Sequence, residues 1–118
     1  ATSPSLSNYI EYPTFFRTPP SDAYQGMASA DVIKNVFGWD NVIVISATDA
    51  YSAAGAAAFE LSALNAELTV TQSKQVNELP SYSSLTAAVN AISGSSTRIV
   101  FMMAQAFTAG LIMREAYA

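Results

Sequence analysis

Residues 39–55 read Trp-Asp-Asn-Val-Ile-Val-Ile-Ser-Ala-Thr-Asp-Ala-Tyr-Ser-Ala-Ala-Gly, and this stretch decides the fold. Its Val-Ile-Val-Ile run at 42–45 is unbroken and mostly β-branched, whereas a strand with one face in water alternates apolar and polar residues. The run therefore predicts a central strand of a parallel sheet that is covered on both faces. Small polar residues at 46–50 and an alanine-rich helical pattern from Tyr51 follow it. Open α/β sheets bind ligands at this junction, beyond the carboxyl ends of their strands.

The segment before this unit predicts a short strand and a helix. Residues 14–18 have the character of a strand, which the following Pro-Pro pair ends. Ser21 is a typical helix N-cap, and the helix after it is expected to run to about Phe37, with Gly38 just past its end. The predicted buried stripe of this helix consists of Tyr24, Met27, Ala28, Val32, Val36 and Phe37.

The segment after this unit continues the alternation of helices and strands. The expected elements are a helix at 51–65, a strand nearer the sheet edge at 67–72, a loop at 73–83, a helix at 84–92, a central strand at 98–103 and a helix from 105 onward. Gly55 lies inside the first of these helices, which indicates close packing or ligand approach there. The order predicts an α/β fold with a parallel sheet flanked by helices.

The composition bounds the classes of protein to consider. A chain of 118 residues is one domain or part of one, and 51% hydrophobic with 12% charged residues is typical of a globular protein. The net charge of −4 and only five scattered Lys and Arg argue against a nucleic-acid partner. Without Cys or His, thiolate and imidazole metal sites, disulfides and His-based triads are excluded. Because the last residues continue a helical pattern with no stop signal, we expect a piece of a larger protein.

The sequence contains none of the common catalytic motifs that would indicate an enzyme. The Gly-x-x-x-x-Gly-Lys and Gly-x-Gly-x-x-Gly phosphate loops and the Gly-x-Ser-x-Gly elbow are all absent, and no cofactor is expected. An acid–base pair of Asp22 and Asp49 is a weak hypothesis, because each also has a structural interpretation. Asp22 suits the positive end of a helix dipole, and Asp49 suits an N-cap. In the same way, Thr2 reads as a loop hydroxyl and Tyr51 as an amphipathic residue at a helix start.

Several segments together resemble a known family. They are Ala-Thr-Ser-Pro-Ser-Leu-Ser at 1–7, Tyr-Pro-Thr-Phe-Phe-Arg-Thr at 12–18, Pro-Ser-Asp-Ala-Tyr-Gln at 20–25, Phe-Gly-Trp at 37–39 and Asp-Ala-Tyr at 49–51. The series resembles the ANF-type receptor-family ligand-binding region, as in the ectodomains of class C G-protein-coupled receptors, the metabotropic glutamate and GABA type B receptors. It is also similar to natriuretic-peptide receptor ectodomains and to leucine/isoleucine/valine-binding proteins.

The resemblance implies a particular fold and division of the chain. The family has the type I periplasmic-binding-protein-like fold, a two-lobed Venus-flytrap clamshell in which each lobe is a parallel sheet flanked by helices. Residues 1–17 are then the end of a first-lobe segment with a hinge strand, and 18–118 are the start of the second α/β lobe. The chain is a partial clamshell in this interpretation.

The resemblance also implies a ligand site made of Thr2, Ser3, Asp22, Asp49 and Tyr51. In amino-acid-binding members, the residue matching Thr2 holds the α-carboxylate together with neighbouring backbone N–H groups. The residue matching Asp22 faces the α-ammonium, and the one matching Tyr51 lies over the ligand. These residue types suit the task, because a hydroxyl donates to an anion, a carboxylate attracts a cation and an aromatic face accepts either a cation or an aliphatic stem.

Three functions remain open at this point. The first is the extracellular domain of a membrane receptor for a small amino-acid-like ligand, whose partners are the rest of the clamshell, a membrane-spanning domain and a homo- or heterodimeric second protomer. The second is a periplasmic or secreted amino-acid-binding protein of a transporter. The third is a structural or assembly module that kept the fold without a ligand. Ser52, where the family usually has Gly directly after the tyrosine, bears on ligand selectivity.

Overall fold

The strand β1 (Asn41–Ala47) lies at the centre of a three-stranded parallel sheet in the computed structural model, which describes residues 2–118. β2 (Thr69–Val76) and β3 (Val100–Met103) pair with its two edges, giving the order β2-β1-β3. Residues 42–47 are all buried, which confirms the predicted central strand.

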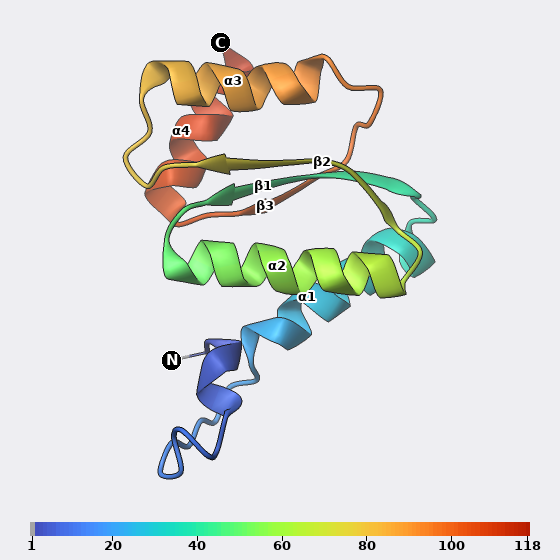
Figure 1. Ribbon diagram of the computed structural model, residues 1–118. Coiled ribbons are helices and arrows are strands. Elements are labelled where there is room, and N and C mark those ends of the chain that lie inside the picture. The colour runs from blue at the N-terminus through green and yellow to red at the C-terminus, as the bar shows by residue number, and fades with distance from the viewer. Residues whose placement is uncertain (1) are drawn as a thin grey trace.

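Helices cover both faces of this sheet (Figure 1). The helices are α1 (Asp22–Asp31), α2 (Ala50–Asn65), α3 (Tyr82–Ser93) and α4 (Ala106–Tyr117), with a 3-10 turn at Pro4–Ser7 and a π-helical turn at Val32–Val36 that prolongs α1. α2 lies on one face of the sheet and α3 and α4 on the other, while α1 packs against α2 (Figure 1). None of these helices within residues 2–118 is long and apolar enough to cross a membrane.

The unbroken apolar run of β1 supplies two separate cores. Successive side chains of a strand point to opposite faces, so Val42 and Val44 pack with Phe59 of α2, whereas Ile43 and Ile45 pack with residues of α3 and α4. On the α2 side, Phe59 also stacks on Phe101 of β3 with ring centroids 3.8 Å apart. Both faces of β1 therefore gain stability from burial, which explains why no position in the run is polar.

The predicted buried stripe of the first helix is wrong. All six of its members are exposed, Tyr24 at 62% and Val36 at 68% among them, and the helix instead buries Asp22, Gly26 and Ala30, spaced by four residues. The reason is that α1 packs on α2 and not on the sheet. A Cβ built on Gly26 would lie 2.7 Å from the backbone nitrogen of Phe59, so the two backbones touch at this point. Small residues, and not large apolar ones, make that contact.

Three further expectations about strands are corrected. Residues 14–18 form no strand, since no sheet edge runs beside them and Arg17 bonds to the preceding segment instead. β2 continues into the first part of the loop expected at 73–83 and ends at Val76, because the strand pairs with β1 as far as Ala47. β3 pairs only with β1 and so lies at an edge of the described sheet. The predicted Gly38 at the helix end is confirmed by its positive φ of 67°.

Candidate functional site

Four of the five predicted ligand-binding residues line one pocket of about 270 Å³, which we call the Asp22 pocket. It is formed by Thr2, Ser3, Asp22, Ala50, Tyr51 and Ala54. The pocket lies where the first turn of α1, the first turn of α2 and the N-terminal segment meet. Because α2 begins directly after β1, this is the carboxyl end of the central strand, where α/β sheets hold their ligands.

Local capping and one close helix contact bring these residues together. The Ser21 side chain accepts a hydrogen bond from the Ala23 N–H and starts α1, which confirms the predicted N-cap. Asp49 starts α2 in the same way and leaves Tyr51 in the first turn. The backbone contact at Gly26 lies one helical turn beyond Asp22, so it holds the beginnings of α1 and α2 at a common corner.

Asp22 is the most unusual residue of the Asp22 pocket. The residue as a whole is only 7% exposed, and its carboxylate makes no hydrogen bond and no salt bridge within residues 2–118, although its oxygens are not among the fully buried unpaired atoms of that range. A carboxylate in such a residue is partly removed from water, which is unfavourable without a partner. The first turn of α1 stabilises the negative charge through the helix dipole, but supplies no counter-ion. The carboxylate is therefore placed to pair with a cation that enters the pocket.

The other residues that line the Asp22 pocket offer hydrogen-bond donors and an aromatic ring. The Thr2 hydroxyl has no partner in the described part of the chain, and the Ser3 hydroxyl pairs only with that of Ser5, at 2.9 Å. Tyr51 is 39% exposed and its phenol makes no hydrogen bond to residues 2–118. The pocket thus combines donors, a carboxylate and an aromatic face around a space bounded by two alanines.

Asp49, the fifth predicted residue, does not line the Asp22 pocket. Its Oδ1 accepts the Ser52 N–H at 3.0 Å, so it acts as the N-cap of α2, and its ligand-binding role stays a prediction. Burial raises the pKa of Asp49, but hydrogen bonding to Ser52 outweighs it and the net pKa lies below the ordinary value. Since Asp49 Oδ2 and the Ser52 hydroxyl have no partner of good geometry within residues 2–118, we attribute the lowering chiefly to the Ser52 N–H.

Sequence reasoning missed Arg17 as a neighbour of the site. Its Nη1 donates to the carbonyl oxygens of Thr2 at 3.4 Å and of Ser3 at 3.0 Å, and its Nη2 donates to the Ser7 hydroxyl. The Phe-Phe-Arg-Thr segment was the available signal, but a single arginine in a loop is ordinarily a surface residue. Nothing in the sequence indicated that Ala50 and Ala54 line the pocket.

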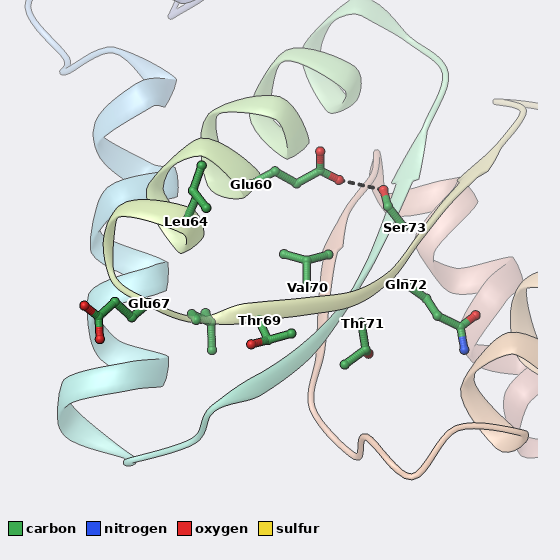
Figure 2. A pocket seen from close by; sticks show the side chains of 9 residues that line it. Glu60, Leu64, Glu67, Thr69, Val70, Thr71, Gln72 and Ser73 are labelled. Atoms are coloured by element: carbon green, nitrogen blue, oxygen red, sulfur yellow. Dashed lines mark hydrogen bonds between the residues drawn. The ribbon is translucent and has the colours of Figure 1, made fainter.

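A larger hollow lies elsewhere on the molecule, but its position and its polar groups suit ligand binding less well. This space has a volume of about 770 Å³ and is lined by residues of α2 and of the edge strand β2. Figure 2 shows the Ser73 and Glu60 side chains there, and the Ser73 hydroxyl donates to Glu60 Oε1 at 2.6 Å. The hollow lies along residues 69–73, the amino half of β2, and so away from the strand ends at which α/β sheets bind ligands. Of its two glutamates, Glu60 is already engaged by the Ser73 hydroxyl. We therefore place the candidate site in the smaller Asp22 pocket.

The full length of the chain, residues 1–118, matches the family described as the receptor family ligand binding region. The chain belongs to this family. The resemblance and the fold that it implied, the type I periplasmic-binding-protein-like α/β fold, are confirmed by that match. The family consists of receptor regions and not of enzymes.

Individual members of the receptor family are similar over most of the chain. The extracellular calcium-sensing receptor of Homo sapiens is 28% identical over 100 residues, which are 85% of this chain and 9% of that receptor. Glutamate receptor 3.7 of Arabidopsis thaliana is 38% identical over 80 residues, 68% of this chain and 8% of that protein. Metabotropic glutamate receptor 4 of Rattus norvegicus is 31% identical over 81 residues, 68% of this chain and 9% of the receptor. The chain thus spans less than a tenth of the length of these relatives.

Proposed function

We propose that this chain is part of the extracellular ligand-binding region of a membrane receptor, and that it binds a small α-amino acid or a close analogue in the Asp22 pocket. The observation that carries the proposal is the carboxylate of the largely buried Asp22, which has no partner within residues 2–118 and shares its pocket with a Thr2 hydroxyl that has none there either. A carboxylate and a hydroxyl donor that line one small space complement the two charged groups of an amino acid.

Each wall of the Asp22 pocket has its own task in this proposal. The ligand's ammonium pairs with Asp22, and its carboxylate accepts hydrogen bonds from the hydroxyls of Thr2 and Ser3. The ring of Tyr51 packs on the ligand's body and its cationic end. A volume of about 270 Å³ and a wall of two alanines favour a small ligand over an extended one.

The division into lobes forms part of the same proposal. Residues 1–17 belong to the first lobe and the hinge, although without the predicted strand, and 18–118 begin the second lobe. In support of this, the N-terminal segment lies at the far end of α1 from the sheet (Figure 1). A ligand held by Thr2 on one side and by Asp22 and Tyr51 on the other then bridges the lobes. Its binding favours closure by the difference in its affinity for the closed and open states.

The test is a calorimetric titration of the full-length protein with the twenty standard amino acids. We expect at least one small member of the panel to bind, and the Asp22→Ala variant to bind it about a hundredfold more weakly, because the variant leaves a desolvated ammonium unpaired. Absence of binding by the wild type rejects the proposal in favour of a structural module. Equal binding by the variant removes Asp22 from the site.

Other expectations concern the complete protein. The relatives' names describe receptors, one of them extracellular, which supports an extracellular location. A membrane-spanning domain and a homo- or heterodimeric arrangement stay predictions. Sequencing of the regions that flank residues 1–118 tests the first, and sedimentation of the full-length protein tests the second.

A further inference from the structure

Arg17 holds the pocket-lining end of the N-terminal segment in place. One guanidinium nitrogen donates to two successive carbonyl oxygens, those of Thr2 and Ser3, and the other donates to the Ser7 hydroxyl. The guanidinium also lies 5.9 Å from the centre of the Phe15 ring, within the range of a cation–π contact. A planar fork of donors suits such a set of acceptors, because a single side chain can satisfy several of them in fixed directions.

These bonds set the direction of a peptide group in the Asp22 pocket. The Thr2 carbonyl oxygen accepts from Arg17 and from the Asp22 N–H, at 3.4 Å and 2.9 Å. The Ser3 N–H belongs to the same trans peptide and so points to the opposite side. This N–H makes no hydrogen bond within residues 2–118, whereas the next peptide, before Pro4, has no N–H to offer. The Ser3 N–H is therefore unpaired within residues 2–118 and points away from Arg17 and the Asp22 N–H, so the donors left to the pocket are the side-chain hydroxyls.

Arg17 also carries a positive charge that has no counter-ion within the described residues. Within the described residues the one salt bridge joins Lys34 to Asp40, and no carboxylate pairs with Arg17. Its guanidinium bonds to the carbonyl oxygens of the two residues whose hydroxyls are the donors of the pocket, Thr2 and Ser3. A positive charge beside these donors favours an anionic group of the ligand there.

We propose that Arg17 is a positioning residue for the ligand's carboxylate: it fixes the backbone of Thr2 and Ser3, which line the pocket, so that their two hydroxyls donate to that carboxylate. This inference rests on the proposed function and deepens it, because it assigns the preference for an anionic group to a residue that does not line the pocket. A purely structural role for Arg17, as a clamp on residues 2–7, is the competing explanation.

The two explanations differ in what they predict for ligands with and without a carboxylate. If Arg17 only stabilises the folded arrangement of residues 2–7, its loss lowers the fraction of protein that is able to bind. The affinities for all ligands then fall by the same factor. A positioning residue acts on the carboxylate alone. The ratio between the affinities for an amino acid and for its neutral α-carboxamide therefore separates the two roles.

The experiment titrates the full-length protein with L-alanine, L-serine and L-glutamate and with the α-carboxamide of each. The variants are Arg17→Ala, Arg17→Gln in case the alanine variant does not fold, and Arg17→Lys, which keeps the charge without the planar fork. Arg98→Ala is the matched control, because Arg98 is exposed and lies just before β3, at the opposite end of the sheet. Hydrogen exchange of the Asp22 amide follows the bond to Thr2 in each variant.

We expect the alanine and glutamine variants to lower the acid-to-amide affinity ratio by about tenfold, the effect of losing one well-placed hydrogen bond to a charged group. Arg17→Lys recovers part of that ratio, Arg98→Ala leaves it unchanged, and the Asp22 amide exchanges faster in the Arg17 variants. A ratio equal to that of the wild type in all three Arg17 variants overturns the inference and leaves the proposed function standing. Absence of binding by the wild type overturns both.

Discussion

The backbone N–H of Asp22 donates to the carbonyl oxygen of Thr2 at 2.9 Å, and this bond ties the first turn of α1 to the N-terminal segment. It brings the Thr2 hydroxyl and the Asp22 carboxylate, 20 residues apart in sequence, to one pocket of about 270 Å³. Their proximity gives the pocket both a hydrogen-bond donor and a negative charge, and the predictions below test the groups that form it.

The Asp22→Asn change separates charge from shape in the pocket. Asparagine has the same outline, so we expect the free energy of unfolding to change by at most about 1 kcal/mol, the size of a helix-dipole contribution. The affinity for the bound amino acid falls by about a hundredfold, because its ammonium loses a counter-ion in a desolvated site. Calorimetry and urea unfolding measure the two quantities. The control is Asp31→Asn on the exposed end of α1, which changes the affinity by less than about twofold.

Tyr51 is expected to act through its ring and not through its hydroxyl. Because the hydroxyl makes no hydrogen bond within residues 2–118, Tyr51→Phe leaves the affinity for the amino acid within about threefold. Tyr51→Ala removes the aromatic wall and weakens binding by about tenfold, as expected for a cation–π and apolar contact. Tyr82→Ala is a suitable control, since Tyr82 also lies in the first turn of a helix, is 74% exposed and does not line the pocket. Equal losses in Tyr51→Phe and Tyr51→Ala would contradict the assignment.

Gly26 tests the contact that holds α1 against α2. A Cβ at this position would lie 2.7 Å from the Phe59 nitrogen and 2.8 Å from the Ala58 carbonyl carbon, and backbone atoms cannot rotate away. Gly26→Ala should therefore destabilise the protein by about 1–3 kcal/mol despite alanine's better helix propensity. Gly110→Ala in α4 is the matched control, because nothing lies within 4 Å of its added Cβ, and it should stabilise by up to about 1 kcal/mol. Thermal unfolding compares the two, and a stabilising Gly26→Ala would show that the helices do not touch there.

Asp49 gives α2 a pH-dependent cap. Its pKa is lower in the folded protein than the ordinary value of 3.8 that applies to the unfolded chain. Its charge therefore contributes stability that is fully present above pH 3.8 and is lost as the pH falls through the folded value. Asp49→Asn keeps a cap but not the charge. Urea unfolding of both proteins should show a stability difference that is constant near neutral pH and shrinks in acid, and a constant difference down to the acid limit would refute this role.

The amino-acid sequence by itself determined the elements that depend on local patterns. The unbroken run at 42–45 predicted a strand with two buried faces, and Ser21 and Asp49 predicted the starts of two helices. These signals are strong because hydrophobic period and N-cap chemistry act over a few neighbouring residues. The resemblance named the candidate ligand residues, but it gave no geometry for them.

Only the tertiary structure decided which surfaces are buried and which residues meet. The apolar stripe of α1 is exposed because that helix packs on α2 through Gly26, and the segment at 14–18 is no strand because no sheet edge lies beside it. Likewise, Arg17 reaches the carbonyls of Thr2 and Ser3 only because the chain folds back on itself. A local pattern fixes the direction of a side chain relative to its own helix or strand, whereas its surroundings depend on contacts between segments far apart in sequence.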